Sequence, residues 1–209
     1  MTPIPKPTAE NYDLIFRDDF NATLAEGWQW LNEDPTAWNL SNVSGSLQIL
    51  TQSGYINLGN AKNVLLRDAP AGDFLVETSL RFDPDEGDQF AGIVLYESNA
   101  DYVQAGLEYC SPVVGCSGQG IYVDIYKNGN LLLPRNEALS RDIVLRIRMA
   151  YENGVIVLYT SQDGTAWFRS FEHEMDMNIT KVGLFAGQNN SALPKPAVFE
   201  YFEVSVPKR

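Results

Sequence analysis

The sequence predicts an all-β protein built as a two-sheet antiparallel sandwich. From residue 74 onward, short segments alternate polar and apolar side chains with a period of two, which is typical of half-buried strands. Short connectors rich in Gly, Asn and Asp join them and favour hairpin turns. No window longer than about ten residues carries the i, i+3, i+4 apolar spacing of an amphipathic helix.

The predicted strands are rich in β-branched and aromatic residues, and turn residues bound each of them. In chain order they are 74–82, 90–97, 102–109, 120–126, 143–149, 155–160, 166–171, 181–187 and 197–204. The first seventy residues are less regular. They contain the motif IFRDDF at 15–20, strand-like segments at 45–50 and 63–70, and the tryptophans of WQW at 28–30.

Length and composition favour one folded domain. A chain of 209 residues is ordinary for a single β-sandwich, and 44% hydrophobic residues can build a core without a disulfide or a metal. Residues 1–12 are expected to be a Pro-rich leader or linker, and residues 13–209 the single domain, since no linker or internal repeat divides them.

The charge and the hydropathy exclude two classes of partner. A net charge of −12 is unsuited to nucleic acid, which requires a basic face, and no apolar run approaches the roughly 20 residues of a membrane span. The start lacks the features of a signal peptide. The chain is therefore either intracellular or a module of a longer secreted protein, and we expect the extracellular or periplasmic setting over the cytoplasmic one.

Cys110 and Cys116 lie in a short loop between two predicted strands. Their spacing suits a local disulfide, which would indicate an oxidising compartment, and the alternative is two free thiols. With one histidine in the chain, a His-rich metal site is excluded.

The order of motifs resembles the concanavalin A-like jelly-roll domains of the DUF1349 group, which also form the C-terminal domain of family 43 β-xylosidases. The matching pieces run from FRDDF through WQW, AWNLSNVSGSLQI and DQFAGIVLYESNADYVQAGLEY to SQDGTAW, KVGLFAG and FEYFEV, about residues 14 to 206. The resemblance implies two antiparallel sheets with the first and last strands as neighbours. It also implies an accessory role, often carbohydrate binding, beside a separate catalytic domain that this chain lacks.

The adjacent acids of FRDDF are poor candidates for a catalytic pair, because neighbouring residues on a regular strand point to opposite faces. The resemblance instead implies a structural calcium ion near the meeting point of the chain ends, with Asp19 and Glu200 as candidate ligands. Calcium binds six to eight hard oxygen ligands, and plain solvated acids are the alternative.

Period two also predicts a sugar-binding face. If the central strands are neighbours, one open face collects tyrosine rings, which stack on sugars, and side chains that bond hydroxyl groups. These residues are Tyr96, Gln104, Glu108, Tyr122, Asp124 and Tyr126. An ordinary solvated sheet face is the alternative.

Three functions remain open from the sequence. The first is a non-catalytic module that binds oligo- or polysaccharides, associated with a glycoside hydrolase acting on plant-type polysaccharides. The second is a glycoside hydrolase or lyase whose carboxylates come from different strands, for example Glu108 and Asp124, at the separation that such chemistry requires. The third is a structural or protein-interaction domain.

Overall fold

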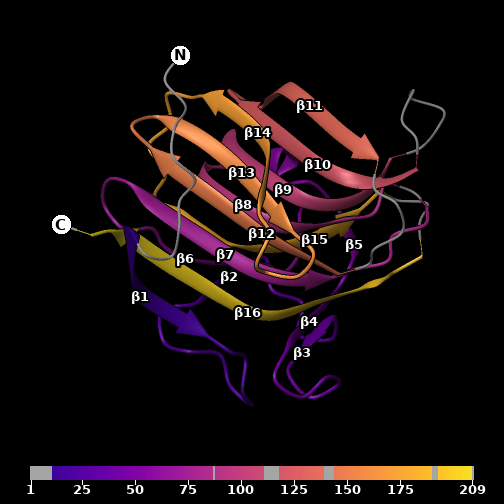
Figure 1. Ribbon diagram of the computed structural model, residues 1–209. Helices are drawn as coiled ribbons and strands as arrows, with labels where there is room; N and C mark the ends of the chain where they lie inside the picture. Colours follow the sequence, from indigo (N-terminus) through magenta and orange to yellow (C-terminus); the bar gives the residue numbers. More distant parts are fainter. Residues whose placement is uncertain (1–10, 87, 111–117, 139–143, 190–192, 209) are drawn as a thin grey trace.

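The computed structural model describes residues 11–86, 88–110, 118–138, 144–189 and 193–208. These residues form two sheets packed face to face, which confirms the predicted all-β sandwich (Figure 1). Among the described residues, no helix has the length and apolarity needed to cross a membrane.

The two sheets are named sheet A and sheet B. Sheet A has the order β14 (Phe168–Glu174), β13 (Val155–Ser161), β12 (Val144–Glu152), β7 (Phe74–Arg81), β16 (Pro196–Pro207), β4 (Leu47–Leu50) and β3 (Trp38–Asn39), with β1 (Tyr12–Asp18) also paired to β16. Sheet B has the order β11 (Asn130–Ala138), β10 (Gly118–Lys127), β9 (Asp101–Cys110), β8 (Phe90–Ser98), β15 (Lys181–Gln188), β6 (Val64–Asp68) and β2 (Gln29–Leu31), with β5 (Gln52–Ser53) parallel to β15.

The two ends of the described chain lie side by side in sheet A (Figure 1). β1 runs antiparallel to β16, from Tyr12 opposite Pro207 to Asp18 opposite Phe202. The expectation that the first and last strands are neighbours is therefore confirmed. Residues 1–10 of the predicted leader lie outside the described residues, and Tyr12 already belongs to β1.

The main core lies between the sheets and consists of the inward-facing residues of both. Val76 and Ile147 from sheet A and Ile93, Ala105 and Leu184 from sheet B are fully buried in it. Trp28 and Trp30 pack against this core, Trp28 on the ring of Phe202. Burial of these apolar side chains is the main driving force for the fold.

A second apolar cluster covers the other face of sheet B. The short 3-10 helix η2 (Ile56–Leu58) and its flanking loop lay Ile56 and Ala61 against Phe90, Val94 and Phe185. Sheet B is thus apolar on both faces in its middle, which explains the near-continuous apolar run of β8.

Two glycines face each other in this part of sheet B. Gly92 on β8 is opposite Gly106 on β9, and a side chain on Gly92 would place its Cβ only 1.9 Å from the carbonyl oxygen of Ala105. Phe185 and Tyr122 flank the pair in register, and the Phe90 ring contacts both, at 5.3 and 6.0 Å between centroids. The glycines therefore allow the close approach of strands on which these rings pack.

Every strand predicted after residue 74 is present, but β11 was not predicted. Pro134 interrupts the run 130–138, and proline cannot donate to a sheet ladder. β11 tolerates it because this strand is the edge of sheet B, with β10 as its neighbour. Only the tertiary arrangement makes this strand an edge.

Candidate functional site

The cross-strand register brings the six predicted sugar-binding residues onto one face of sheet B. Tyr96, Tyr102 and Tyr126 form one row across β8, β9 and β10. Gln104 and Asp124 are opposite each other in the next row, and Tyr122 and then Glu108 follow in the rows beyond. The predicted shared face therefore exists.

The prediction that this face is open was wrong. Tyr122, Gln104 and Tyr126 are only 1%, 4% and 9% exposed, because the segment 55–61 covers the middle of the face. The Tyr102 and Tyr126 rings stack on each other at 4.5 Å between centroids. Rings held in this way, beneath an apolar segment, present no free face on which a sugar could stack.

What remains accessible is the rim of the face. Asp124, Glu108 and Tyr96 are partly exposed, and Tyr55, from the covering segment, joins them. The Tyr55 ring stacks on Phe90 at 6.1 Å, and burial raises the pKa of the Tyr55 hydroxyl, with smaller contributions from the negative charges of Asp88 and then Asp124. Tyr55 lies outside any strand, so the period-two pattern gave no signal for it.

Asp124 and Gln104 form the polar centre of this surface. The Gln104 amide nitrogen donates a hydrogen bond to the Asp124 carboxylate at 3.0 Å. Burial raises the pKa of Asp124 to about 6, and the bond from Gln104 opposes this shift in part. The other end of the Gln104 amide, its buried Oε1, accepts a hydrogen bond from no described residue. A buried acceptor without a donor is costly, so this atom favours a buried water that donates to it.

The structure argues against a catalytic pair formed by Glu108 and Asp124. Both lie on the same face, but Asp124 is opposite Gln104, four residues from Glu108 along β9, which corresponds to about 13 Å. Retaining glycosidases hold their carboxyl groups about 5 Å apart and inverting ones roughly 6.5–9.5 Å apart. The row containing Tyr122 separates the two acids.

In the FRDDF motif, Asp18 organises the loop that follows β1. Its carboxylate accepts hydrogen bonds from the backbone nitrogens of Phe20 and Ala25, both at 2.8 Å, and from the indole nitrogen of Trp28 at 2.9 Å. Asp18 is 6% exposed. These three donors explain how a charge is tolerated among aromatic residues at the end of a strand.

Asp19 and Glu200, the candidate calcium ligands, are both exposed and engaged elsewhere. Asp19 pairs with Arg17, and Glu200 accepts a hydrogen bond from the Ser79 hydroxyl at 2.8 Å. Within the described ranges, no group of three or more His, Cys, Asp or Glu residues is arranged to hold a metal ion. Calcium binding by Asp19 and Glu200 with backbone carbonyls therefore stays an untested prediction.

Cys110 ends β9 and is disulfide-bonded. Cys116 lies outside the described residues, so the pairing of the two cysteines stays a prediction.

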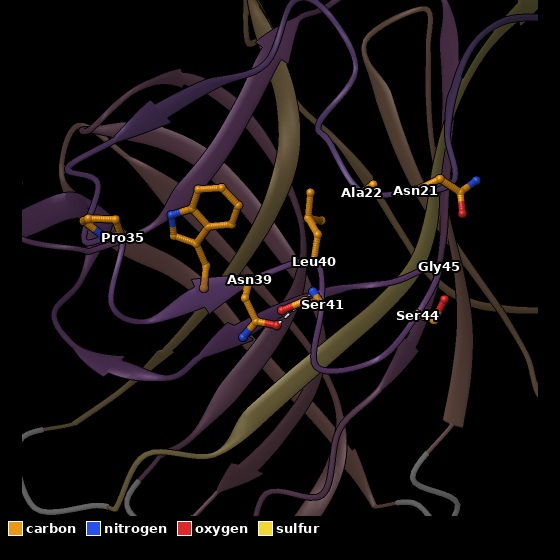
Figure 2. Close-up of a pocket in the computed structure, with 9 residues that line it drawn as sticks. Asn21, Ala22, Pro35, Asn39, Leu40, Ser41, Ser44 and Gly45 are labelled. Carbon is orange, nitrogen blue, oxygen red and sulfur yellow. Dashed lines mark hydrogen bonds between the residues drawn. The ribbon is translucent and has the colours of Figure 1, made fainter.

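A pocket of about 680 Å³ lies at the other end of the molecule, among loops for which the sequence analysis proposed no function. Figure 2 shows Asn21 and Ala22 on one side of it and Ser44 and Gly45 on the facing segment. Residues around β3 complete the lining, which includes Trp38, Asn39, Leu40 and Ser41. No regular period connects these loop residues, so only the folded chain assembles them.

Two sheets of this topology, with the chain ends paired and one sheet face covered by a loop, define a concanavalin A-like β-sandwich domain. Residues 17–205 match the family described as the beta xylosidase C-terminal concanavalin A-like domain (GH43_C2). The match covers most of the chain, and the chain therefore belongs to this family. No curated protein matches it in sequence.

Solved structures share the fold at low sequence identity. The GH43 BlXynB protein from Bacillus licheniformis is 24% identical, with a TM-score of 0.80, over 97% of this chain and 40% of that one. The xylan beta-1,4-xylosidase from Bacillus halodurans C-125 is 22% identical, with a TM-score of 0.75, over 91% and 39% of the two chains. A functionally unknown protein from Saccharomyces cerevisiae is 14% identical, with a TM-score of 0.66, over 88% and 98%. The chain thus spans about 40% of the length of the two GH43 proteins.

Proposed function

We propose that this protein is a non-catalytic accessory module that binds an oligo- or polysaccharide and acts beside a catalytic glycoside hydrolase domain. Membership of a family named for the C-terminal domain of β-xylosidases supports the accessory role. The separation of Glu108 and Asp124 along the strands supports the absence of glycosidase chemistry on this sheet.

The observation that carries the binding proposal is the partly exposed Asp124 carboxylate at the rim, which the buried Gln104 amide nitrogen holds with a hydrogen bond of 3.0 Å. A carboxylate fixed in this way accepts hydrogen bonds from sugar hydroxyl groups. Tyr55 and Tyr96 on the same rim supply partly exposed rings next to this polar centre. The ligand would lie across the rim, since the rows of Tyr122 and Tyr126 beneath it are closed.

Isothermal titration with xylan-, arabinan- and β-glucan-derived oligosaccharides tests this proposal. We expect millimolar or tighter binding of at least one of them. Asp124→Ala should weaken that binding about tenfold or more, because a hydrogen bond to a charged group contributes about 1.5–3 kcal/mol. Tyr55→Ala should weaken it too.

Asp68→Asn is the matched control, because Asp68 is an exposed carboxylate on β6 that pairs with Lys181. The affinity of the Asp68→Asn variant for the oligosaccharide should equal that of the unmodified protein. The assignment of this surface would be refuted if no oligosaccharide bound. It would also be refuted if Asp124→Ala and Tyr55→Ala left the affinity for the bound oligosaccharide unchanged.

The disulfide at Cys110 bears on the setting of the protein. Disulfides persist in oxidising compartments, which supports an extracellular or periplasmic location as part of a secreted protein.

A further inference from the structure

The pocket beside β3 combines an aromatic wall with neutral polar groups. Trp38 lines it, and the indole packs against Trp30, whose ring lies 4.8 Å away between centroids. The indole nitrogen of Trp38 donates to Glu33 at 3.2 Å. The ring is therefore held in place before any ligand arrives, which lowers the entropic cost of binding.

The polar groups of the pocket are placed to bond a ligand. Asn39 uses its Oδ1 to accept from the backbone nitrogens of Ser41 at 3.2 Å and Asn42 at 2.8 Å, which orders the turn that carries Ser41. Across the described residues, the side chains of Asn21, Ser41 and Ser44 have no hydrogen-bond partner in the protein. No charged side chain is among the lining residues, so the pocket favours a neutral ligand rich in hydroxyl groups.

The backbone of the pocket wall is strained. Phe20 and Ala22 have φ values of 54° and 65°, in the left-handed region, where every other described non-glycine residue is Asn or Asp. Alanine and phenylalanine lack the short polar side chain that eases this conformation. Such strain persists where surrounding contacts impose it, and it is concentrated at binding sites.

The contacts that impose this conformation come from Asp18. Its bonds to the backbone of Phe20 and Ala25 close the loop on both sides of Ala22, while the Phe20 side chain is fully buried in the core. The acid of the FRDDF motif thus shapes the wall that carries Asn21 and Ala22. This arrangement gives the loop one conformation, with Asn21 lining the pocket.

We propose that this pocket is a second carbohydrate-binding site for a neutral oligosaccharide, with the C–H face of one sugar residue against Trp38 and hydroxyls of a further residue bonded to Asn21 and Ser44. It is separate from the Asp124 surface. β3 ends sheet A and lies far from β10 and β11 in the fold (Figure 1). A module with two such sites could bind two segments of one polysaccharide chain, which raises avidity without new contacts.

Nuclear magnetic resonance of the ¹⁵N-labelled full chain tests this site directly, with xylotriose, arabinotriose and cellotriose as probes. We expect saturable shifts of the Trp38 indole signal and of the Asn21 and Ser44 amides at millimolar concentration. Asn21→Ala and Ser44→Ala, both at exposed positions, should each weaken the affinity about three- to tenfold through loss of one neutral hydrogen bond.

Asn42→Ala is the matched control, since Asn42 is an exposed neighbour outside the lining, and its affinity should be unchanged. Asp124→Asn should leave the Trp38 shifts intact, which separates this site from the proposed surface on sheet B. Ser41→Trp should fill the pocket and abolish the shifts. The proposal is overturned if none of the three probes shifts these signals, or if Ser41→Trp retains the shifts of the unmodified protein.

Discussion

The two acids of FRDDF are neighbours in sequence, yet the structure predicts that they contribute very differently to the stability of the fold. Asp18 is buried and accepts three hydrogen bonds, from the nitrogens of Phe20, Ala25 and Trp28. Asp19 is exposed and pairs with Arg17 at the surface. Replacing each with alanine therefore compares a structural carboxylate with a solvated one in the same motif.

The expected loss for Asp18→Ala follows from its three donors. A hydrogen bond to a charged group contributes about 1.5–3 kcal/mol, and the lower end applies here because two of the bonds are only partly buried. The free energy of unfolding should fall by about 4 kcal/mol. For a domain of this size, that loss corresponds to a decrease in Tm of about 10 °C.

Asp19→Ala should change the free energy of unfolding by less than about 1 kcal/mol, since exposed ion pairs contribute little. Urea denaturation followed by tryptophan fluorescence measures both losses, and Trp28 reports on the loop itself. A loss below about 1 kcal/mol for Asp18→Ala, or equal losses for the two variants, would refute the view that Asp18 holds the loop.

Two further predictions concern pH and calcium. Burial raises the pKa of Asp124 to about 6, above the value of about 3.9 in an unfolded chain. Between these values the folded state binds more protons, so the free energy of unfolding should fall by about 3 kcal/mol as pH rises from about 3 to about 7. In the Asp124→Asn variant the free energy of unfolding should not fall in this way as pH rises. Its Tm should therefore exceed that of the unmodified protein at pH 7 but not at pH 4. Parallel Tm profiles for the two proteins across this range would contradict the prediction. For calcium, an ion bound by Asp19 and Glu200 would raise the Tm in millimolar calcium above that in EDTA, and equal Tm values in the two conditions would exclude the site.

The sequence predicted the strands well because each strand shows its own alternation of side chains with a period of two. In β9, Tyr102, Gln104 and Glu108 alternate with buried Val103, Ala105 and Leu107, so the two faces can be separated before any partner strand is known. Where the evidence is local but misleading, as with Pro134 in β11, the prediction failed. A proline argues against a strand unless the strand is an edge, and edge position is a property of the whole sheet.

The candidate site was only partly predictable. The sequence identified which side chains share a face of sheet B, but it did not predict that this face is covered. Ile56 and Ala61 cover it from a loop whose side chains show no regular alternation. Tyr55 joins the rim for the same reason. Likewise, Asn21 and Ser44 meet across the second pocket only after Asp18 has folded the loop between β1 and β2.

The amino-acid sequence by itself determined the all-β class, the strands from Phe74 onward and which side chains share a face, because alternation along a strand is a local property of the backbone. The tertiary structure decided which of those faces stays open and where loops meet to form a pocket. Covering a face requires contacts between segments far apart in the chain, as when Ile56 joins the same buried cluster as Tyr102. Such contacts depend on packing, to which no local pattern is a guide.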